Sequence, residues 1–433
     1  MDTHLVTSRR RFLASSTMIL VGGAFINLNP RVQARRVSPN DKLNIGVVGV
    51  ANQGRYNLDN VSSQNIVALC DVDANFLNEA AAKHPSAQKY RDFRKLIAQK
   101  DIDAIVVATP DHTHAVITAA VLKSGRHAYC EKPLTHTLSE ARYITELAAK
   151  QKLVTQIGTQ IHAGSNYRRV VELIRSGAIG AVKEVHVWVG SSYGNVKRPT
   201  ETPAEPSTLD YDLWVGPVEK RPYHPDYLPF KWRNWWAFGG GSLADFGCHF
   251  MDLPHWALDL RHPLSAQADG PTLDSESTPT ALTVRYKYPA RGAQPAVDLT
   301  WYHGGRKPSL LEPDMAAKWG SGVLFIGSKG QLISDYGRHL LFPEKDFAGF
   351  VPPAKTIPES IGHHAEWILA CKTGGKTTCS FDYSGPLTEA ALLGNLAYRV
   401  GKPIDWDSAH QKARGNPGAD ALIQHQYRKG WKL

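Results

Sequence analysis

Short apolar runs alternate with longer amphipathic segments in the first third of the chain. Apolar runs at residues 42–49 and 105–110, the run 65–70 and a short run ending at Cys130 predict buried parallel strands, because strands covered on both faces are almost continuously hydrophobic. A helix is expected after each strand. This alternation predicts a doubly wound α/β domain, with ligands bound beyond the carboxyl ends of its strands.

The pattern changes after about residue 180. The segments 184–189, 281–288, 297–302, 322–326 and 331–335 alternate or are rich in β-branched and aromatic residues, and Gly327–Gly330 forms a turn between two of them. They predict a mostly antiparallel sheet, with helices at 167–176, around 245–255, from His363, and at 384–400. We therefore expect an α/β protein with a Rossmann domain at 35–160 and an α+β domain with a large open sheet at 161–433. C-terminal helices could pack back on the first domain.

The amino terminus has a different composition. Arg9–Arg10–Arg11–Phe12–Leu13 precedes an uncharged stretch and then Val32–Gln33–Ala34, which is the order of an export signal. The paired arginines are similar to those of twin-arginine signals, whose pathway exports folded proteins. Residues 1–34 are expected to be removed from a soluble periplasmic protein. An uncleaved anchor is the alternative, although the apolar stretch is short for a membrane span.

The net charge limits the kinds of binding partner, and the cysteine content predicts the state of the thiols. The chain of 433 residues has a formal charge of +10, and loss of the signal, with four arginines and one aspartate, lowers it by three to +7. Its basic residues are scattered, which indicates no nucleic-acid partner and allows some attraction to anionic glycans. The five cysteines have no metal-type spacing, and we expect mostly free thiols.

The first strand runs into a glycine turn. Gly49–Val50–Ala51–Asn52–Gln53–Gly54 fits the dinucleotide pattern except that Ala51 replaces the middle glycine, where the backbone approaches a pyrophosphate. Asp71 follows 22 residues after Gly49, where a carboxylate accepts hydrogen bonds from a ribose 2′-hydroxyl and repels a 2′-phosphate. This favours NAD over NADP. Asp73 is the competing candidate, and either residue could instead cap the next helix.

Two further motifs carry acid–base chemistry. Lys132, in Glu131–Lys132–Pro133, follows a predicted strand and would project into the ligand crevice, where desolvation lowers a lysine pKa. Asp245 and His249 lie four residues apart on a predicted helix and share one face. The alternatives are a surface Glu–Lys pair and a structural Asp–His pair. A metal site at His249, Asp252 and His255 needs a helix break at Pro254, because the two histidines lie about 240° apart on a helix, so we predict no metal.

Residues 199–229 are proline-rich and too long for a plain connection. Such segments usually cover a site or a subunit contact. Trp232, Trp235 and Trp236 crowd its end, where they either pack or form a stacking floor for a sugar ring. His363 or His364 could close the cleft, and a surface or capping role is the alternative.

Together these motifs resemble the glucose–fructose oxidoreductase/inositol dehydrogenase (Gfo/Idh/MocA) superfamily, including an exported bacterial branch. The glycine turn, Thr109–Pro110–Asp111–His112–Thr113–His114, Glu131–Lys132–Pro133 and Gly239–Gly240–Gly241–Ser242–Leu243–Ala244–Asp245 occur in its order. The resemblance implies the catalytic trio Lys132, Asp245 and His249. It implies cofactor contacts from the following residues: Gly49, Ala51, Asn52, Gln53, Gly54, Asp71, Thr109, Pro110, His112, His114, Glu131, Lys132 and Gln160. Substrate contacts are expected from His162, Tyr167, Arg168, Trp235, Trp236, Asp245 and His249.

These expectations define a nicotinamide-dependent oxidoreductase that acts on a secondary hydroxyl of a sugar, polyol or glycoside. An exported enzyme lacks a replenished NAD pool, so our hypothesis is that NAD is loaded before export, kept, and regenerated in each cycle. A redox-assisted glycoside hydrolase that forms a transient 3-keto sugar is the first alternative. A catalytically silent glycan-binding protein is the second, on the strength of Ala51. A homo-oligomer assembled through the C-terminal sheet is also expected.

Overall fold

Six parallel strands form the first sheet of the computed structural model, which describes Ser38 and residues 41–433. Their order is β3-β2-β1-β4-β5-β6, the doubly wound order of dinucleotide-binding domains. The strands are β1 (Asn44–Val48), β2 (Asn65–Cys70), β3 (Gln88–Tyr90), β4 (Ala104–Val107), β5 (His127–Cys130) and β6 (Thr155–Ile157). The predicted Rossmann fold is confirmed.

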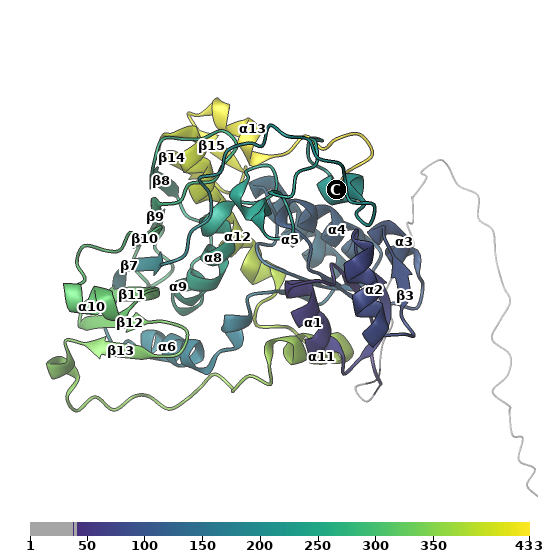
Figure 1. Cartoon of the computed structure of the whole chain (residues 1–433). Helices are drawn as coiled ribbons and strands as arrows, with labels where there is room; N and C mark the ends of the chain where they lie inside the picture. The colour runs from purple at the N-terminus through teal and green to yellow at the C-terminus, as the bar shows by residue number, and fades with distance from the viewer. Residues whose placement is uncertain (1–37, 39–40) are drawn as a thin grey trace, which may run out of the picture. The chain divides into compact units, whose positions relative to one another are not determined.

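The helices of this part cover both faces of the sheet. They are α1 (Gln53–Val61), α2 (Ala74–Lys83), α3 (Phe93–Ala98), α4 (Asp111–Lys123) and α5 (Leu138–Gln151) (Figure 1). Their starts follow from the sequence: Asp73 caps α2, Asp92 caps α3, and Thr137 with Glu140 forms a capping box on α5. Two buried apolar clusters, one containing Ile105 and the other Val106, lie on the opposite faces of β4.

The second sheet has nine strands in the order β13-β12-β11-β7-β10-β9-β8-β14-β15. Only β7 and β10 pair in parallel, which confirms a mostly antiparallel sheet. The strands are β7 (Val182–Val189), β8 (Ser265–Asp269), β9 (Leu282–Tyr288), β10 (Val297–His303), β11 (Gly322–Gly327), β12 (Gly330–Ser334), β13 (His339–Phe342), β14 (Ile404–Asp407) and β15 (Lys412–Arg414).

The remaining helices join the two sheets. They are α6 (Ser165–Arg175), α7 (Tyr211–Val215), α8 (Gly241–Phe250), α9 (Asp252–Leu258), α10 (Pro313–Lys318), α11 (His363–Thr373), α12 (Phe381–Val400) and α13 (Asp420–Ile423), with 3₁₀ turns at Gln160–Ala163, Lys231–Asn234, Glu344–Phe347 and Pro417–Ala419. The buried helix α12 packs against α5 and β6 of the first sheet and against α8 and β8 of the second. The two sheets therefore share one long core helix.

The helix expected to carry Asp245 through His255 is two helices. Helix α8 ends at Phe250 and α9 begins at Asp252, so the break lies three residues before Pro254. Proline has no amide hydrogen and cannot donate to the carbonyl of Phe250, so one hydrogen bond of a continuous helix would be missing here.

The expected export signal, residues 1–34, lies outside the described residues. Among the residues that are described, no helix is both long and apolar enough for a membrane crossing. All five cysteines are free and buried, which agrees with the expectation of free thiols.

Candidate active site

The glycine turn after β1 packs tightly on the end of β4. Gly49 has a φ of +82°, and a Cβ there would lie 2.5 Å from the carbonyl oxygen of Ala108. A Cβ on Gly54 would lie 2.0 Å from the carbonyl oxygen of Gly49, so the first and third glycines are sterically required. Ala51 occupies the middle position and faces a cavity of about 470 Å³. Helix α1 begins directly after this turn without a side-chain cap.

The acid after β2 lies in the same cavity. The two carboxylate oxygens of Asp71 accept hydrogen bonds from the backbone amides of Val50 and Asp73, both at 3.0 Å. Burial raises the pKa of Asp71 to about 6. Asp73 also borders the cavity, but its side chain accepts from Asn75 N at 2.9 Å and caps α2. The capping alternative therefore holds for Asp73, whereas Asp71 is tied to the glycine turn.

Glu131 has one carboxylate oxygen without a partner. Its Oε1 accepts hydrogen bonds from Gln53 Nε2 (3.1 Å), Asn57 Nδ2 (2.9 Å) and Gln160 Nε2 (2.8 Å). Its Oε2 is buried and accepts none. This oxygen lies against Gly158, where a Cβ would come within 2.3 Å of it, while Glu131 as a residue borders the cavity. Burial also raises the pKa of this carboxyl group.

Lys132 forms an ion pair with Asp245 from α8, across the join between the two sheets. Arg233 Nε lies 3.2 Å from the same Asp245 oxygen, and its guanidinium stacks 4.1 Å from the ring centre of Trp232. Although burial opposes it, the two cations lower the pKa of Asp245 well below its usual range. Asp111 lies buried beside this cluster, and burial raises its pKa to about 8. The carboxylate of Asp245 is thus held between two cations that line the cavity.

His249, one helical turn after Asp245, lies where two cavities meet. It lines the 470 Å³ cavity and also a second cavity of about 620 Å³ over the second sheet, and Gln160 is the other residue that lines both. Burial, reinforced by Lys132 and Arg233, lowers the pKa of His249 to about 3. Its imidazole is therefore neutral at physiological pH and can accept a proton. Within the part of the chain that the structure describes, the side chains of His249 and Asp245 are not hydrogen-bonded to each other.

Most of the residues expected at the cofactor share the first cavity. Its lining includes Gly49, Ala51, Asn52, Gln53, Asp71, Thr109, Pro110, Glu131, Lys132 and Gln160. Gly54 supports the turn from beneath. His112 and His114 are outside the lining: His112 Nε2 lies 2.8 Å from the carbonyl oxygen of Trp214, and both ring nitrogens of His114 lie 2.7 Å from backbone carbonyl oxygens. These two histidines hold the start of α4 in place.

The residues expected at the substrate are less well placed. His162 is fully buried, its Nδ1 donates to Asp252 at 2.9 Å, and its ring stacks 3.9 Å from Trp256. Arg168 is paired with Glu366 at 2.6 Å. Tyr167, Trp235 and Trp236 are buried and line neither the first nor the second cavity. Of the expected set, Asp245 and His249 alone lie at the site, and the other five residues are buried in the protein core.

The structure also shows the surroundings of the histidines that were considered for a metal site or for closing the cleft. His255 faces Tyr288 at 3.0 Å, so it does not meet His249 around an ion. The described residues that could hold a metal are His162, Asp252 and Cys379, whose donor atoms lie within 4.8 Å of one another. In this group, His162 Nδ1 and the carboxylate of Asp252 are already hydrogen-bonded to each other. His363 and His364 are buried against Ile157 and Asn57, respectively, and neither closes the cleft.

Several site residues were not expected from the sequence. Arg233 and Asp111 complete the charge cluster, and neither position carries a local signal. The remaining additions cover the first cavity and come from a distant loop and the C-terminal segment: Leu209, Leu213, Trp214, Leu228, Pro229, Phe230 and Trp431. The length of the loop was the one available sign that it covers a site.

Comparison with known proteins assigns both halves of the chain. Residues 43–159 match a family described as "Oxidoreductase family, NAD-binding Rossmann fold", and residues 168–298 match its "C-terminal alpha/beta domain". Inositol 2-dehydrogenase from Salmonella typhimurium is 31% identical over 150 residues, 33% of this chain and 45% of that protein. A glycosyl hydrolase family 109 protein from Shewanella putrefaciens is 23% identical over 199 residues, 40% of this chain and 43% of that protein. The chain thus spans about half the length of the curated relatives it matches.

Solved structures share the fold over a longer stretch. The WlbA dehydrogenase from Bordetella pertussis, in complex with NADH and UDP-GlcNAcA, superposes with a TM-score of 0.60 at 17% identity, covering 84% of this chain and 99% of that one. At this identity the likeness concerns the fold. The glycine turn and Asp71 fit NAD in the first cavity. The chain belongs to the Gfo/Idh/MocA family of oxidoreductases, with an NAD-binding Rossmann domain.

Proposed function

We propose that this protein is an NAD-dependent oxidoreductase acting on a secondary hydroxyl of a sugar, polyol or glycoside. The observation that carries the proposal is the position of His249, which lines both the cofactor cavity and the open cavity beside it. A hydroxyl group bound at this junction is within reach of a neutral imidazole and of the Lys132–Asp245 pair. Both the family and the named activity of the inositol 2-dehydrogenases are consistent with this assignment.

The chain supplies the acid–base chemistry. His249 accepts the hydroxyl proton, because its lowered pKa keeps the imidazole neutral before the reaction. Lys132 polarises the same oxygen as negative charge develops on it, and Asp245 fixes the lysine from across the join. Arg233 holds Asp245 ionised. Bound NAD supplies the acceptor for the hydride that leaves the substrate carbon.

A long loop and the C-terminal segment cover the cofactor cavity. In the loop, Leu209 forms a β-bridge with Asp73, and the carbonyl of Thr208 accepts from the amide of Ala74 (2.9 Å) and from Arg91 (2.8 Å). These contacts tie the loop to the turn after β2. Residues 205–231 and Trp431 therefore form a strap over the cavity.

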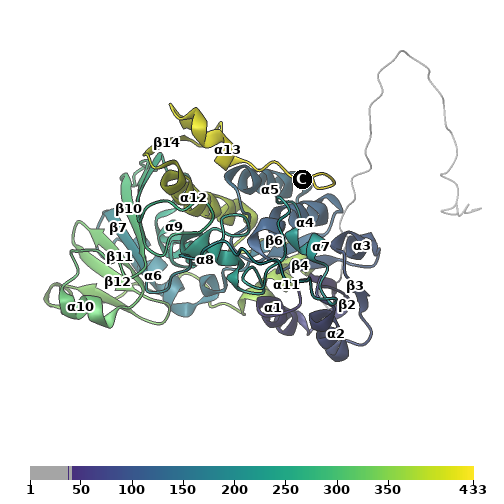
Figure 2. The ribbon, with the colours of Figure 1, turned by 45° about the horizontal axis from the view of Figure 1, so that its top comes forward.

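The C-terminal segment holds this strap down. Figure 2 shows the chain leaving α13 and ending beside α4, α5 and α7. Arg428 pairs with both carboxylate oxygens of Asp212 in α7, at 2.8 and 3.0 Å, and donates to the carbonyl of Gly216 at 2.5 Å. Trp431 packs 6.0 Å from Phe93 and lines the cavity. A strap anchored at both sides supports the proposal that NAD is kept between turnovers.

Export and assembly belong to the same proposal. We propose that residues 1–34 direct the folded, NAD-loaded protein to the periplasm through the twin-arginine pathway, because the retained cofactor removes the need for an external pool. The nine-stranded sheet would carry the contact of a homo-oligomer. Light scattering of the purified protein and detection of the protein in a periplasmic fraction would test these two points.

A redox-assisted glycoside hydrolase is the second candidate, and the covered cofactor cavity favours it. Oxidation of a ring hydroxyl at C3 makes the hydrogen on C2 acidic, so a base can remove it while the glycosidic bond breaks and the aglycone leaves with a proton. Water then adds across the double bond, and the hydride returns to the ketone. Electrons balance within the cycle, so no external NAD is needed. The glycosyl hydrolase family 109 relative is consistent with this route.

The test starts with the purified protein and no added nucleotide. Denaturation should release near-stoichiometric NAD(H), identified by absorbance and mass. Empty protein that also fails to bind added NAD would overturn both catalytic proposals and leave a silent glycan-binding protein. Release of a keto sugar from glycosides would support the oxidoreductase, and release of an aglycone without net redox would support the hydrolase.

The strap is tested by Arg428→Ala. Loss of its pairing with Asp212 should speed NAD release about fivefold, measured by trapping the released nucleotide with an NAD-consuming enzyme. Arg414→Ala is the matched control, because Arg414 forms a similar pair with Asp407 at 3.1 Å away from the cofactor cavity. Equal release rates in the two variants would show that the strap does not retain NAD.

A further inference from the structure

The open cavity beside His249 has no formally charged side chain in its lining. Its polar residues are Gln160, Ser191 and Ser321, and His249 is neutral. Lys132 and Arg233, which line the adjoining cofactor cavity, are both paired with Asp245. An anionic group entering this cavity would lose hydration without gaining a counter-charge.

Aromatic rings form one wall of this cavity. Tyr336 stacks on Phe250 with ring centres 4.6 Å apart and an interplanar angle of 20°, and Phe246 stacks on Tyr193 at 5.7 Å. The Tyr336 side chain is 39% exposed, which is unusual for a large aromatic residue at the edge of a core. Its ring centre lies 6.5 Å from that of His249. The C–H face of a sugar ring packs favourably on such a surface.

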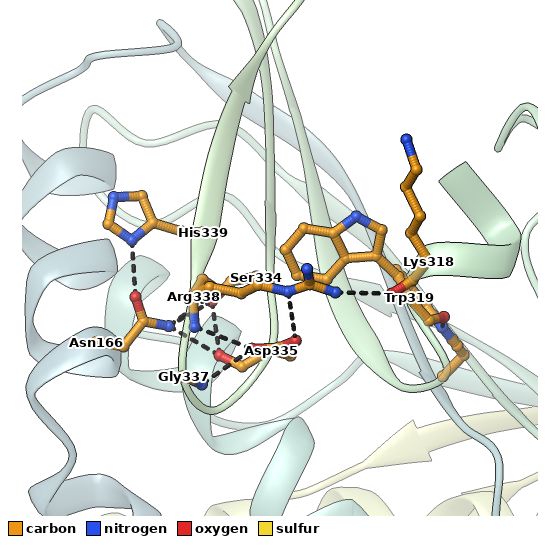
Figure 3. A network of polar contacts seen from close by, with 9 residues as sticks. Asn166, Lys318, Trp319, Ser334, Asp335, Gly337, Arg338 and His339 are labelled. Atoms are coloured by element: carbon orange, nitrogen blue, oxygen red, sulfur yellow. Dashed lines mark hydrogen bonds and ion pairs between the residues drawn. The ribbon is translucent and has the colours of Figure 1, made fainter. Parts of the chain in front are cut away.

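A polar network fixes the turn that carries Tyr336 (Figure 3). Asp335 accepts from the backbone amides of Gly337 and Arg338, both at 2.9 Å. From α6, the side-chain amide of Asn166 donates to the carbonyls of Asp335 (2.8 Å) and Arg338 (3.1 Å). The guanidinium of Arg338 stacks 4.3 Å from the Trp319 ring centre. Elements from three parts of the chain therefore hold Tyr336 in place before any ligand arrives.

We propose that Phe246, Phe250 and Tyr336 form a subsite for a neutral pyranose or neutral glycoside, with Tyr336 as its specificity-determining residue. The ring lies against Tyr336 and presents a secondary hydroxyl to His249. Uronic acids and phosphorylated sugars are excluded, because the lining offers no counter-charge. The inference rests on the proposed function and names its substrate class.

The test compares neutral methyl pyranosides with their uronate counterparts on the NAD-loaded enzyme. Calorimetry measures binding, and absorbance of the bound nicotinamide measures reduction. The neutral member of at least one pair should bind about 100-fold more tightly than its uronate. Equal or tighter binding of the uronates would overturn the inference, with the oxidoreductase proposal intact if they reduce the nicotinamide. Neutral sugars that bind selectively without reducing it would support the subsite and overturn the oxidoreductase. Binding of no sugar would overturn the inference.

Three variants sharpen the result. Tyr336→Ala should raise the KM for the neutral sugar about 10-fold with kcat changed less than about twofold, whereas Tyr336→Phe should keep the wild-type KM. Ser191→Lys places a cation in the lining and should strengthen uronate binding about 10-fold. An unchanged KM in Tyr336→Ala, with wild-type NAD content, would overturn the role of Tyr336.

Discussion

Two carboxylate–imidazole sets lie within one helical turn of each other and have opposite surroundings. In the first, His249 of α8 faces two cavities, and the carboxylate of Asp245, one turn earlier, is bound to Lys132 and Arg233. In the second, Asp252 of α9 pairs with His162 at 2.9 Å, and neither side chain is exposed. The residue types are the same, but the partners differ.

The surroundings decide what each set can do. Tyr383 donates to Asp252 at 2.7 Å, and Trp256 covers the imidazole, so the second set is buried away from ligands, although His162 Nε2 has no hydrogen-bond partner. In the first set, the carboxylate of Asp245 pairs with Lys132 and Arg233. The imidazole of His249 has no hydrogen-bonding partner among the described residues. Chemistry requires an imidazole that a ligand can reach, which His249 offers at the two cavities and the buried His162 does not. The predictions below test that division.

The largest effect is expected from Lys132→Met. Removal of the ammonium group leaves the developing charge on the substrate oxygen without its nearest cation, and kcat should fall about 1,000-fold. NAD content should remain close to wild type, whereas the thermal midpoint should fall, because the buried Asp245 loses one of its two cationic partners, so kcat is given per folded molecule. Lys95→Met, at an exposed position of α3, is the control. A variant with more than a tenth of wild-type kcat would contradict the assignment of Lys132.

His249→Gln should lower kcat about 100-fold, because the base is lost while the side-chain volume is largely kept. The pKa of His249 is about 3, so wild-type kcat/KM should show no titration of this residue near pH 6.5. Below about pH 6.5 the unfolded chain binds a proton here that the folded chain does not, and acidification therefore favours unfolding.

The variant should consequently lose less stability than the wild type between about pH 6.5 and about pH 4, measured by urea unfolding. His410→Gln, on the surface, is the matched control. An acid limb near pH 6.5 that vanishes in His249→Gln would show that the imidazole is solvated and titrates normally.

Asp252→Asn should lower stability and leave catalysis almost unchanged, the opposite of the effect expected for His249→Gln. The folded protein should lose about 3 kcal/mol of unfolding free energy, because a buried pair is broken and Tyr383 loses a charged acceptor. The kcat per folded molecule should change less than about threefold. Asp259→Asn, which alters a surface carboxylate at the end of α9, is the control. A catalytic loss larger than that of His249→Gln would place the second set in the reaction.

Tyr383→Phe should give the smallest effect, about 1 kcal/mol of unfolding free energy, because one hydrogen bond to Asp252 is lost and the ring is kept. Urea unfolding of this variant, of Asp252→Asn and of the double variant forms a cycle. Strict additivity in the cycle would mean that the tyrosine hydroxyl and the carboxylate do not interact as the 2.7 Å contact requires.

The sequence was sufficient for the strands and the glycine turn. Apolar runs and turn residues are local, so β2 and the turn at Gly327–Gly330 were predicted within a residue or two. Lys132 and Asp245 were expected to meet, and the two halves of the chain bring them into contact. The split between α8 and α9 was missed, since Pro254 acts on hydrogen bonds one turn earlier.

Burial was the less predictable part. Some side chains that could bind a sugar are instead buried in the core, and no local sequence pattern indicates this: His162, Trp235 and Trp236. Tyr336, by contrast, was not expected at the site from the sequence. The turn that carries it is fixed by Asn166, which lies 170 positions earlier. Arg233 and Trp431 approach the site from distant segments. Contacts over such separations follow from tertiary packing and have no local pattern.

Of the described residues, Gln160 and His249 line both cavities, which therefore adjoin each other. Under the proposed function, a sugar that leaves as a ketone leaves its hydride behind in the covered cavity. One enzyme molecule then releases one ketone and stops, until a carbonyl compound enters the cavity that held the sugar and collects that hydride. The reaction rate is therefore set by the ratio of two carbohydrates outside the protein and is independent of the redox state of the cell.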